Sequence, residues 1–176
     1  MSNFSLIPFA SDALPIIEIV GSIDRVDRIL SIEYQLLGDL DSVAIASPAV
    51  APSRKFELWE ATCFEFFIGG LGDRNYWEFN LSPSGDWNVF HLDNYRQGLR
   101  NETVFTTLPF DLDRSANSLT LKLGFDLSQI ISIDRQLEVS VTTVIRSTQD
   151  EISYWALTHC GEEADFHLRD SFVIKI

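Results

Sequence analysis

The stretch TCFEFFI (62–68) alternates in character from residue to residue, and two similar segments follow it, YWEFNL (Tyr76–Leu81) and WNVFHL (Trp87–Leu92). An alternation with a period of two predicts β-strands with two distinct faces. The intervening segments GGLGD (69–73) and PSGD (83–86) are rich in turn-forming residues. The three segments are therefore expected to form an antiparallel meander.

The same alternation recurs along most of the chain. It is clearest in RILSIEYQLLG (28–38), NSLTLKLGF (117–125) and QLEVSVTTVI (136–145). Shorter strands are expected at 15–20, 103–110, 152–158 and 172–176. Only 126–132 is typical of a helix, with Asp126 as its N-cap, and 42–54 is typical of a long loop. Short strands without helical crossovers predict an all-β fold: a two-sheet antiparallel β-sandwich, immunoglobulin-like or jelly-roll-like, forming a single domain over residues 1–176 with one short helix.

The chain is strongly acidic. Thirteen Lys and Arg residues against 26 Asp and Glu residues give its 176 residues a formal net charge of −13. A field of that sign repels phosphate backbones and anionic lipids, so neither nucleic acid nor a membrane is expected as a partner. No signal peptide or transmembrane segment is visible, so a cytoplasmic location is expected, with Cys63 and Cys160 as free thiols. The sequence leaves the oligomeric state open.

The meander is expected to separate an apolar face from a polar one. Burial of the apolar sets would bring Glu65, Glu78 and Asn80 together on the second face. The apolar sets are Phe64, Phe66 and Ile68 in the first strand and Trp77, Phe79 and Leu81 in the second. The third strand is ambiguous, because the hairpin register would place either Trp87, Val89 and His91 or Asn88 and Phe90 on the polar face.

Several interpretations of the polar face stay open. Carboxylates and amides among aromatic rings are typical of a sugar site, whereas the commoner arrangement is a solvated outer face of a sandwich. Two nearby Glu residues are also compatible with glycoside hydrolysis.

Metal-capable residue types gather near the C-terminus, but their spacing matches no closed zinc motif. They are His159, Cys160, Glu162, Glu163, Asp165 and His167, with Cys63 as a more distant candidate. A loop whose Asp165 and His167 make turn hydrogen bonds is the favoured explanation. A Cys63 nucleophile paired with His159 is the alternative, although a strand cysteine is usually a small buried side chain.

Five segments together resemble the bacterial DOMON-like proteins, whose relatives include the family-9 carbohydrate-binding modules. They are RKFELWEATCFEFF (54–67), YWEFNLSPSGDWNVF (76–90), DNYRQG (93–98), SYWALTH (153–159) and ADFH (164–167). The combination is more specific than any one segment. The resemblance implies a sandwich of two antiparallel sheets whose concave face holds a sugar or a haem.

The resemblance also implies roles for individual residues. In sugar-binding relatives two Trp rings enclose a terminal sugar, and the matching positions here are Trp59 and, more loosely, Trp155, with Glu65 as a hydrogen-bonding residue. Haem-binding relatives use a Met and a His as axial ligands, and Met1 is the only methionine of this chain, so haem is disfavoured.

A non-catalytic domain that recognises a saccharide or similar polyol on its concave face is the leading hypothesis. Besides the residues implied by the resemblance, Glu78 and Asn80 are expected to bind the ligand, because the alternation places them on the polar face with Glu65. Arg54 and Arg96 are further candidates for a hydroxyl or carboxylate of the ligand. A carbohydrate is the expected partner and no cofactor is expected. The alternatives are a structural or protein-interaction sandwich without a small ligand, a haem- or metal-binding domain, and an enzyme.

Overall fold

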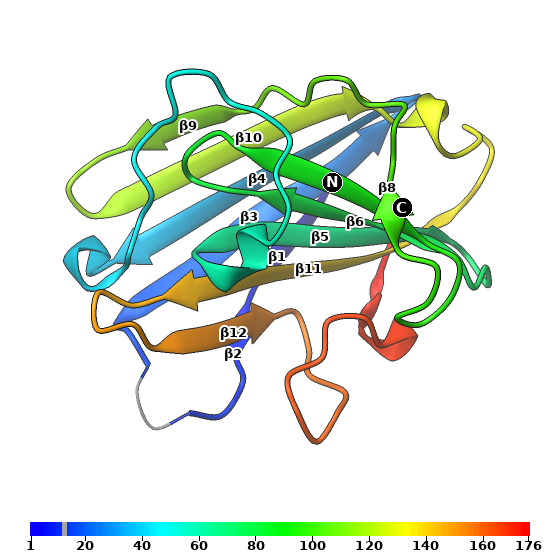
Figure 1. The fold of residues 1–176 in the computed structure, drawn as a ribbon. Helices are drawn as coiled ribbons and strands as arrows, with labels where there is room; N and C mark the ends of the chain where they lie inside the picture. The colour runs from blue at the N-terminus through cyan, green and yellow to red at the C-terminus, as the bar shows by residue number, and fades with distance from the viewer. Residues whose placement is uncertain (12–13) are drawn as a thin grey trace.

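The computed structural model of the protein describes residues 1–11 and 14–176. Two antiparallel sheets pack face to face (Figure 1). The first sheet has the order β1-β3-β4-β10-β9 in the described residues. Its strands are β1 (Ser2–Ser5), β3 (Ile17–Val26), β4 (Ile29–Gly38), β10 (Ser118–Asp126) and β9 (Asp111–Arg114).

The second sheet carries the predicted meander and has the order β2-β12-β11-β5-β6-β7-β8, with β13 paired to β11. Its strands are β2 (Ile7–Pro8), β12 (Ile152–Ala156), β11 (Leu137–Arg146), β5 (Cys63–Gly70), β6 (Tyr76–Leu81), β7 (Trp87–Leu92), β8 (Arg100–Asn101) and β13 (Ile174–Lys175). The short N-terminal strands β1 and β2 belong to different sheets, so the chain crosses the sandwich at Leu6, which is buried. The predicted β-sandwich is confirmed.

The core between the sheets contains the apolar sets of the meander. Phe66 and Phe79 stack with their ring centroids 4.4 Å apart, and Phe125 of the facing sheet lies 4.9 Å from Phe79. Trp87 and Val89 of β7 join this core. Because the hairpin register pairs Leu81 with Trp87, it places Asn88 and Phe90 on the opposite face, which settles the ambiguity left by the sequence.

The outer face of the second sheet is covered rather than solvated. Phe166 and Phe172 from the segment after β12 pack against Phe67 and Tyr76 of the sheet, in a second cluster of buried side chains. This segment is the orange and red part of the chain in Figure 1. The expectation of a solvated outer face is therefore wrong for this part of the sheet.

Some predicted elements are absent or shorter. The strand expected at 103–110 is irregular chain, because this segment leaves β8 in one sheet for β9 in the other and buries Phe105 and Leu108 on the way. The helix expected at 126–132 is a single 3-10 turn, η3 (Leu127–Gln129), and Asp126 caps it as predicted by accepting a hydrogen bond from the Ser128 amide. The strand expected at 172–176 is reduced to β13.

The remaining helical segments are also single 3-10 turns: η1 (Leu40–Ser42), η2 (Leu58–Glu60) and η4 (Arg169–Ser171). In the part of the chain that the structure describes, no helix has the length and apolar character needed to cross a bilayer.

Candidate functional site

The floor of the site is built by β5 and β6 on the outer face of the second sheet. Glu65 pairs with Asn80 and Phe67 pairs with Glu78 across the two strands. Glu65 and Glu78 are therefore diagonal neighbours on the same face, as the alternation predicted. Both are buried, with only 3% and 5% of their surfaces exposed.

One wall of the site is the Trp59 ring. Trp59 lies in the 3-10 turn η2, which ends just before β5 and so places the ring beside the strand that carries Glu65. Phe56 packs edge-on against Trp59 at 5.2 Å, and Phe90 of the sheet lies 5.9 Å from it. These contacts hold the half-buried indole over the floor.

The opposite wall comes from two loops. Phe166 and His167 belong to the segment after β12, and Arg96 and Leu99 belong to the segment between β7 and β8. Asp165 ties the loops together: its carboxylate accepts hydrogen bonds from Arg96 Nη2 at 2.9 Å and from the Tyr95 hydroxyl at 2.5 Å. The Asp165 carboxylate is therefore one of the contacts that hold the two loops of this wall together.

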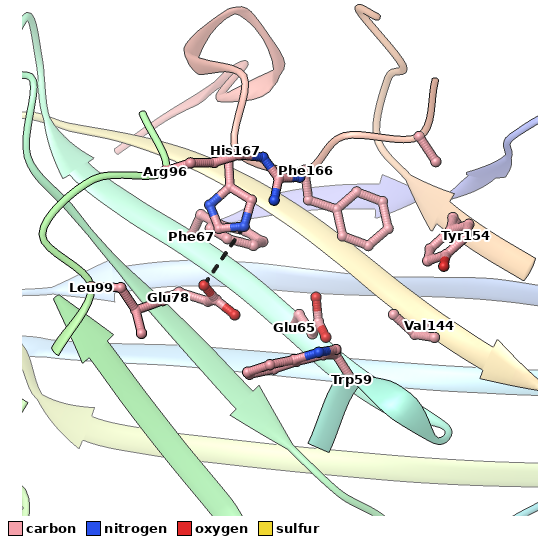
Figure 2. Close-up of a pocket in the computed structure, with 11 residues that line it drawn as sticks. Trp59, Glu65, Phe67, Glu78, Arg96, Leu99, Val144, Tyr154, Phe166 and His167 are labelled. Atoms are coloured by element: carbon pink, nitrogen blue, oxygen red, sulfur yellow. Dashed lines mark ion pairs between the residues drawn. The ribbon is translucent and has the colours of Figure 1, made fainter. Parts of the chain in front are cut away.

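Floor and walls enclose a cavity of about 380 Å³. Figure 2 shows Trp59 on one side of the two carboxylates, with Arg96, His167 and Phe166 on the other. Tyr154 and Leu99 are partly exposed members of the lining. Pockets that bind small molecules have volumes of about 300–1,000 Å³, so the cavity is suited to a ligand at the small end of that range.

The pKa values of both carboxyl groups are raised. Burial raises the pKa of Glu65 well above its ordinary value, and the negative charge of Glu78 adds to this effect. Burial likewise raises the pKa of Glu78 to about 7, although Asn80 Nδ2 donates a hydrogen bond of 2.8 Å to its Oε1. Glu65 Oε1 is buried and has no hydrogen-bond partner among the described residues. An unpaired buried acceptor is costly, so this oxygen is available to a donor from a ligand.

His167 faces Glu78 as a neutral ring. Burial and the charge of Arg96 lower the pKa of His167 to about 4. The Tyr76 hydroxyl accepts a hydrogen bond from the Arg96 amide at 3.3 Å, so its proton is free for His167 Nδ1 at 2.8 Å. This leaves the proton of His167 on Nε2, which lies 3.9 Å from Glu78 Oε2. Because the pKa of Glu78 is raised and that of His167 is lowered, the two side chains are better described as a neutral pair than as an ion pair.

The structure brings some of the predicted site residues together and separates others. Trp59, Glu65, Glu78 and Arg96 line the cavity, while Asn80 is buried outside the lining and donates a hydrogen bond to Glu78. Trp155 is buried in the core between the sheets, where its indole nitrogen donates to Ser153 Oγ. The aromatic residue that strand β12 contributes to the cavity is its neighbour Tyr154, because successive strand residues point to opposite faces.

Arg54 also lies outside the cavity lining. Its guanidinium donates to Asn88 Oδ1 and to the backbone oxygens of Val89, Glu102 and Phe105, at 2.5–3.2 Å. The same group stacks over Trp87 at 4.3 Å. These contacts connect the long loop after η1 to β7 and to the irregular segment that follows β8.

Replacing Arg54 by alanine is expected to lower the free energy of unfolding by about 1–3 kcal/mol, because several backbone acceptors lose a charged donor. Saccharide affinity should change by less than about twofold, since none of these contacts reaches the cavity. Arg54→Lys is the matched control, which keeps the charge without the planar fork. Urea unfolding and calorimetric titration measure the two effects, and a large loss of affinity in a folded variant would restore the predicted ligand role of Arg54.

The sequence did not identify several residues of the cavity. Phe67 and Val144 lie on the face that carries Glu65, and Phe166 and Ala164 come from irregular chain. The alternation could have indicated Phe67 and Val144, whereas no local pattern in 157–173 predicts which of its side chains reach the sheet.

The proposed metal and nucleophile arrangements find no support in the geometry. No group of three or more His, Cys, Asp or Glu side chains within residues 1–11 and 14–176 could hold a metal ion. His159 Nε2 bonds to the Ile7 carbonyl at 2.9 Å, whereas the buried Cys63 thiol faces Asn80, and burial raises its pKa. The predicted turn hydrogen bond is present, from the His167 amide to Asp165 Oδ1 at 3.0 Å.

Comparison with known proteins gives similar folds at low sequence identity. No protein-family model matches the chain, and no curated protein matches it in sequence. A candidate carbohydrate-binding protein from Bacteroides uniformis has a similar structure, with a TM-score of 0.72 and 19% identity over 97% of this chain and 83% of that one. A family-9 carbohydrate-binding module from Caldicellulosiruptor kristjanssonii, solved in complex with glucose, has a TM-score of 0.47 and 9% identity over 84% of this chain and 70% of that one. The first likeness shows a shared fold.

Proposed function

We propose that this chain is a non-catalytic saccharide-binding domain that holds a single sugar residue in the cavity between Trp59 and the loop wall. The observation that carries the proposal is the position of Trp59 beside two buried carboxyl groups, Glu65 and Glu78, in one small cavity. An aromatic ring packs on the apolar C–H face of a pyranose, and carboxyl oxygens accept hydrogen bonds from its hydroxyls.

The location of the acceptors supports this proposal. Glu65 Oε1 lacks a partner among the described residues, and a sugar hydroxyl would supply the missing donor. Leu99 and Tyr154 line the cavity and are partly exposed, so the rest of a longer glycan would extend past them into solvent. The structurally similar protein from Bacteroides uniformis is described as a candidate carbohydrate-binding protein, which agrees with the proposal without deciding it. Membership of the DOMON-like proteins stays a prediction.

A binding role is favoured over glycoside hydrolysis by the placement of the two carboxyl groups. A glycosidase needs two carboxyl groups that flank the scissile bond. Glu65 and Glu78 are diagonal neighbours on one sheet face and together form one floor. The pair would therefore meet a ligand from the same side, which is suited to binding it rather than to cleaving it.

Replacing Trp59 by alanine tests the function. In calorimetric titrations with a panel of neutral and amino monosaccharides, the unaltered chain is expected to bind at least one with a Kd in the micromolar to millimolar range. Trp59→Ala should weaken that binding about 10- to 100-fold, because the stacking surface is removed. Trp59→Phe is the matched control, and it should retain most of the affinity because it keeps an aromatic face.

The proposal fails if no saccharide of either kind binds at millimolar concentration. It also fails if a folded Trp59→Ala variant binds as tightly as the unaltered chain.

A further inference from the structure

We propose that the cavity selects an amino sugar, whose ammonium group lies between the carboxylates of Glu65 and Glu78. This rests on the saccharide-binding function proposed above and adds the chemical class of the ligand. The geometry that supports it is a cavity floor made of two adjacent buried carboxyl groups, one of them with an oxygen unpartnered in the described chain.

Hydrogen-bond capacity favours an ammonium over a hydroxyl at this floor. When ionised, the carboxyl groups of Glu65 and Glu78 are acceptors only, and Asn80 already gives one of its amide protons to Glu78. A sugar hydroxyl has a single proton to donate, whereas an ammonium group has three. A single ammonium can therefore serve both carboxylates at once, whereas a single hydroxyl serves one, and the ammonium hydrogen bonds are strengthened by charge.

The charges around the floor also favour a cationic ligand. The titratable side chains that line the cavity are Glu65, Glu78, Arg96, Tyr154 and His167, and those in contact with them are Cys63, Tyr76, Tyr95 and Asp165. Arg96 is the one permanent cation among them, and Asp165 already pairs with it at 2.9 Å. His167 is neutral near pH 7 because burial lowers its pKa to about 4. Two ionised carboxylates would thus stand without a free cation, so an empty floor relieves the repulsion by taking up protons.

An ammonium group would take the place of those protons. Binding of the cation should therefore release protons from the Glu65–Glu78 pair into the buffer. A neutral sugar would bind to the protonated floor without such a release. Proton release is a readout that a purely structural role of the two residues would not produce.

The test compares matched sugars. Glucosamine is titrated against glucose, and galactosamine against galactose, by calorimetry at pH 6.5 in two buffers of different ionisation enthalpy. We expect the better amino sugar to bind about 10- to 100-fold more tightly than its parent hexose, as charge-assisted hydrogen bonds imply, and to release protons. N-acetylglucosamine, whose amide is uncharged, should lose the advantage.

Two variants assign the preference to the floor. Glu65→Gln and, separately, Glu78→Gln should reduce the preference for the amino sugar to less than about threefold. Glu33→Gln is the matched control, because Glu33 lies on β4 of the other sheet and pairs with Lys122. Its preference should equal that of the unaltered chain. Thermal unfolding establishes that each variant is folded.

The outcomes separate this inference from the function on which it rests. If hexoses bind as tightly as their amino counterparts, or if both floor variants keep the preference, the inference is overturned while saccharide binding stands. If Ca²⁺ displaces the amino sugar at micromolar concentration, the floor is a cation site and the inference is again overturned. If no saccharide binds, the proposed function and the inference both fall.

Discussion

Replacing Phe79 by alanine is expected to lower the free energy of unfolding by about 3–5 kcal/mol, the typical cost of removing a large aromatic side chain from a packed core. Phe79 is fully buried at the centre of the sandwich. Its ring stacks on Phe66 at 4.4 Å and also contacts Phe125 at 4.9 Å and Phe105 at 5.8 Å. The variant would lose contacts with both sheets and with the segment that crosses between them.

Equilibrium unfolding in urea measures the effect. Val50→Ala is the control, because Val50 lies in the exposed loop before β5, and its truncation should change the free energy of unfolding by less than about 0.5 kcal/mol. A loss below about 1 kcal/mol for Phe79→Ala would mean that the two sheets do not pack through this aromatic cluster.

Phe79 lies between Glu78 and Asn80 in β6, two residues of the proposed site. Its neighbours Glu78 and Asn80 point to the cavity side, while Phe79 points into the core. The period of two in YWEFNL therefore fixes the core and the site in the same strand. For this reason the sequence predicts both the sandwich and the floor of the cavity, including Glu65 in the adjacent strand.

The sequence was less informative wherever the chain leaves the sheets. The segment 103–110 has the composition of a strand, but it connects two sheets and so cannot pair with the strands of either one. Its residue Phe105 is buried by side-chain packing alone. The wall formed by Phe166 and His167 has the same origin, since irregular chain has no period from which a face can be predicted.

Trp155 illustrates the limit of assigning a strand residue to a face from composition. The segment SYWAL contains two aromatic rings on opposite faces of the strand, Tyr154 and Trp155, and strand pairing decides which of them faces the core. Trp155 is opposite Thr143, which in turn is opposite Phe64 of the core face. A shift of one residue in this pairing would exchange the faces of Trp155, which lies in the core, and Tyr154, which lies at the cavity. That pairing is a long-range property, which no local pattern in the sequence contains.

Glu78 and His167 are expected to give the stability of the fold two opposing dependences on pH. The pKa of Glu78 is raised by burial to about 7 from an ordinary value of 4.5, so between those pH values the folded chain keeps a proton that the unfolded chain has released. Stability from this group is complete below pH 4.5 and is lost as the pH rises through 7. The loss amounts to about 2–4 kcal/mol.

His167 acts in the opposite direction. Burial lowers its pKa to about 4 from 6.5, so between those pH values the unfolded chain binds a proton that the folded chain does not. Stability from this group is complete above pH 6.5 and is lost as the pH falls through 4. From pH 4.5 to 6.5 the effects of Glu78 and His167 offset each other, and the raised pKa of Glu65 adds a further loss of stability as the pH rises.

Single variants should separate the two effects. Glu78→Gln removes one of the contributions that fall with pH, so its stability should increase from pH 4.5 to 6.5 relative to that of the unaltered chain. His167→Gln removes the contribution that rises, so its stability should fall over the same interval relative to the unaltered chain. Urea unfolding at several pH values measures the slopes, with Glu151→Gln in an exposed turn as the control. Parallel profiles for all three variants would contradict the opposite pKa shifts of Glu78 and His167. In that case Glu78 would not hold the proton that a cationic ligand is expected to release.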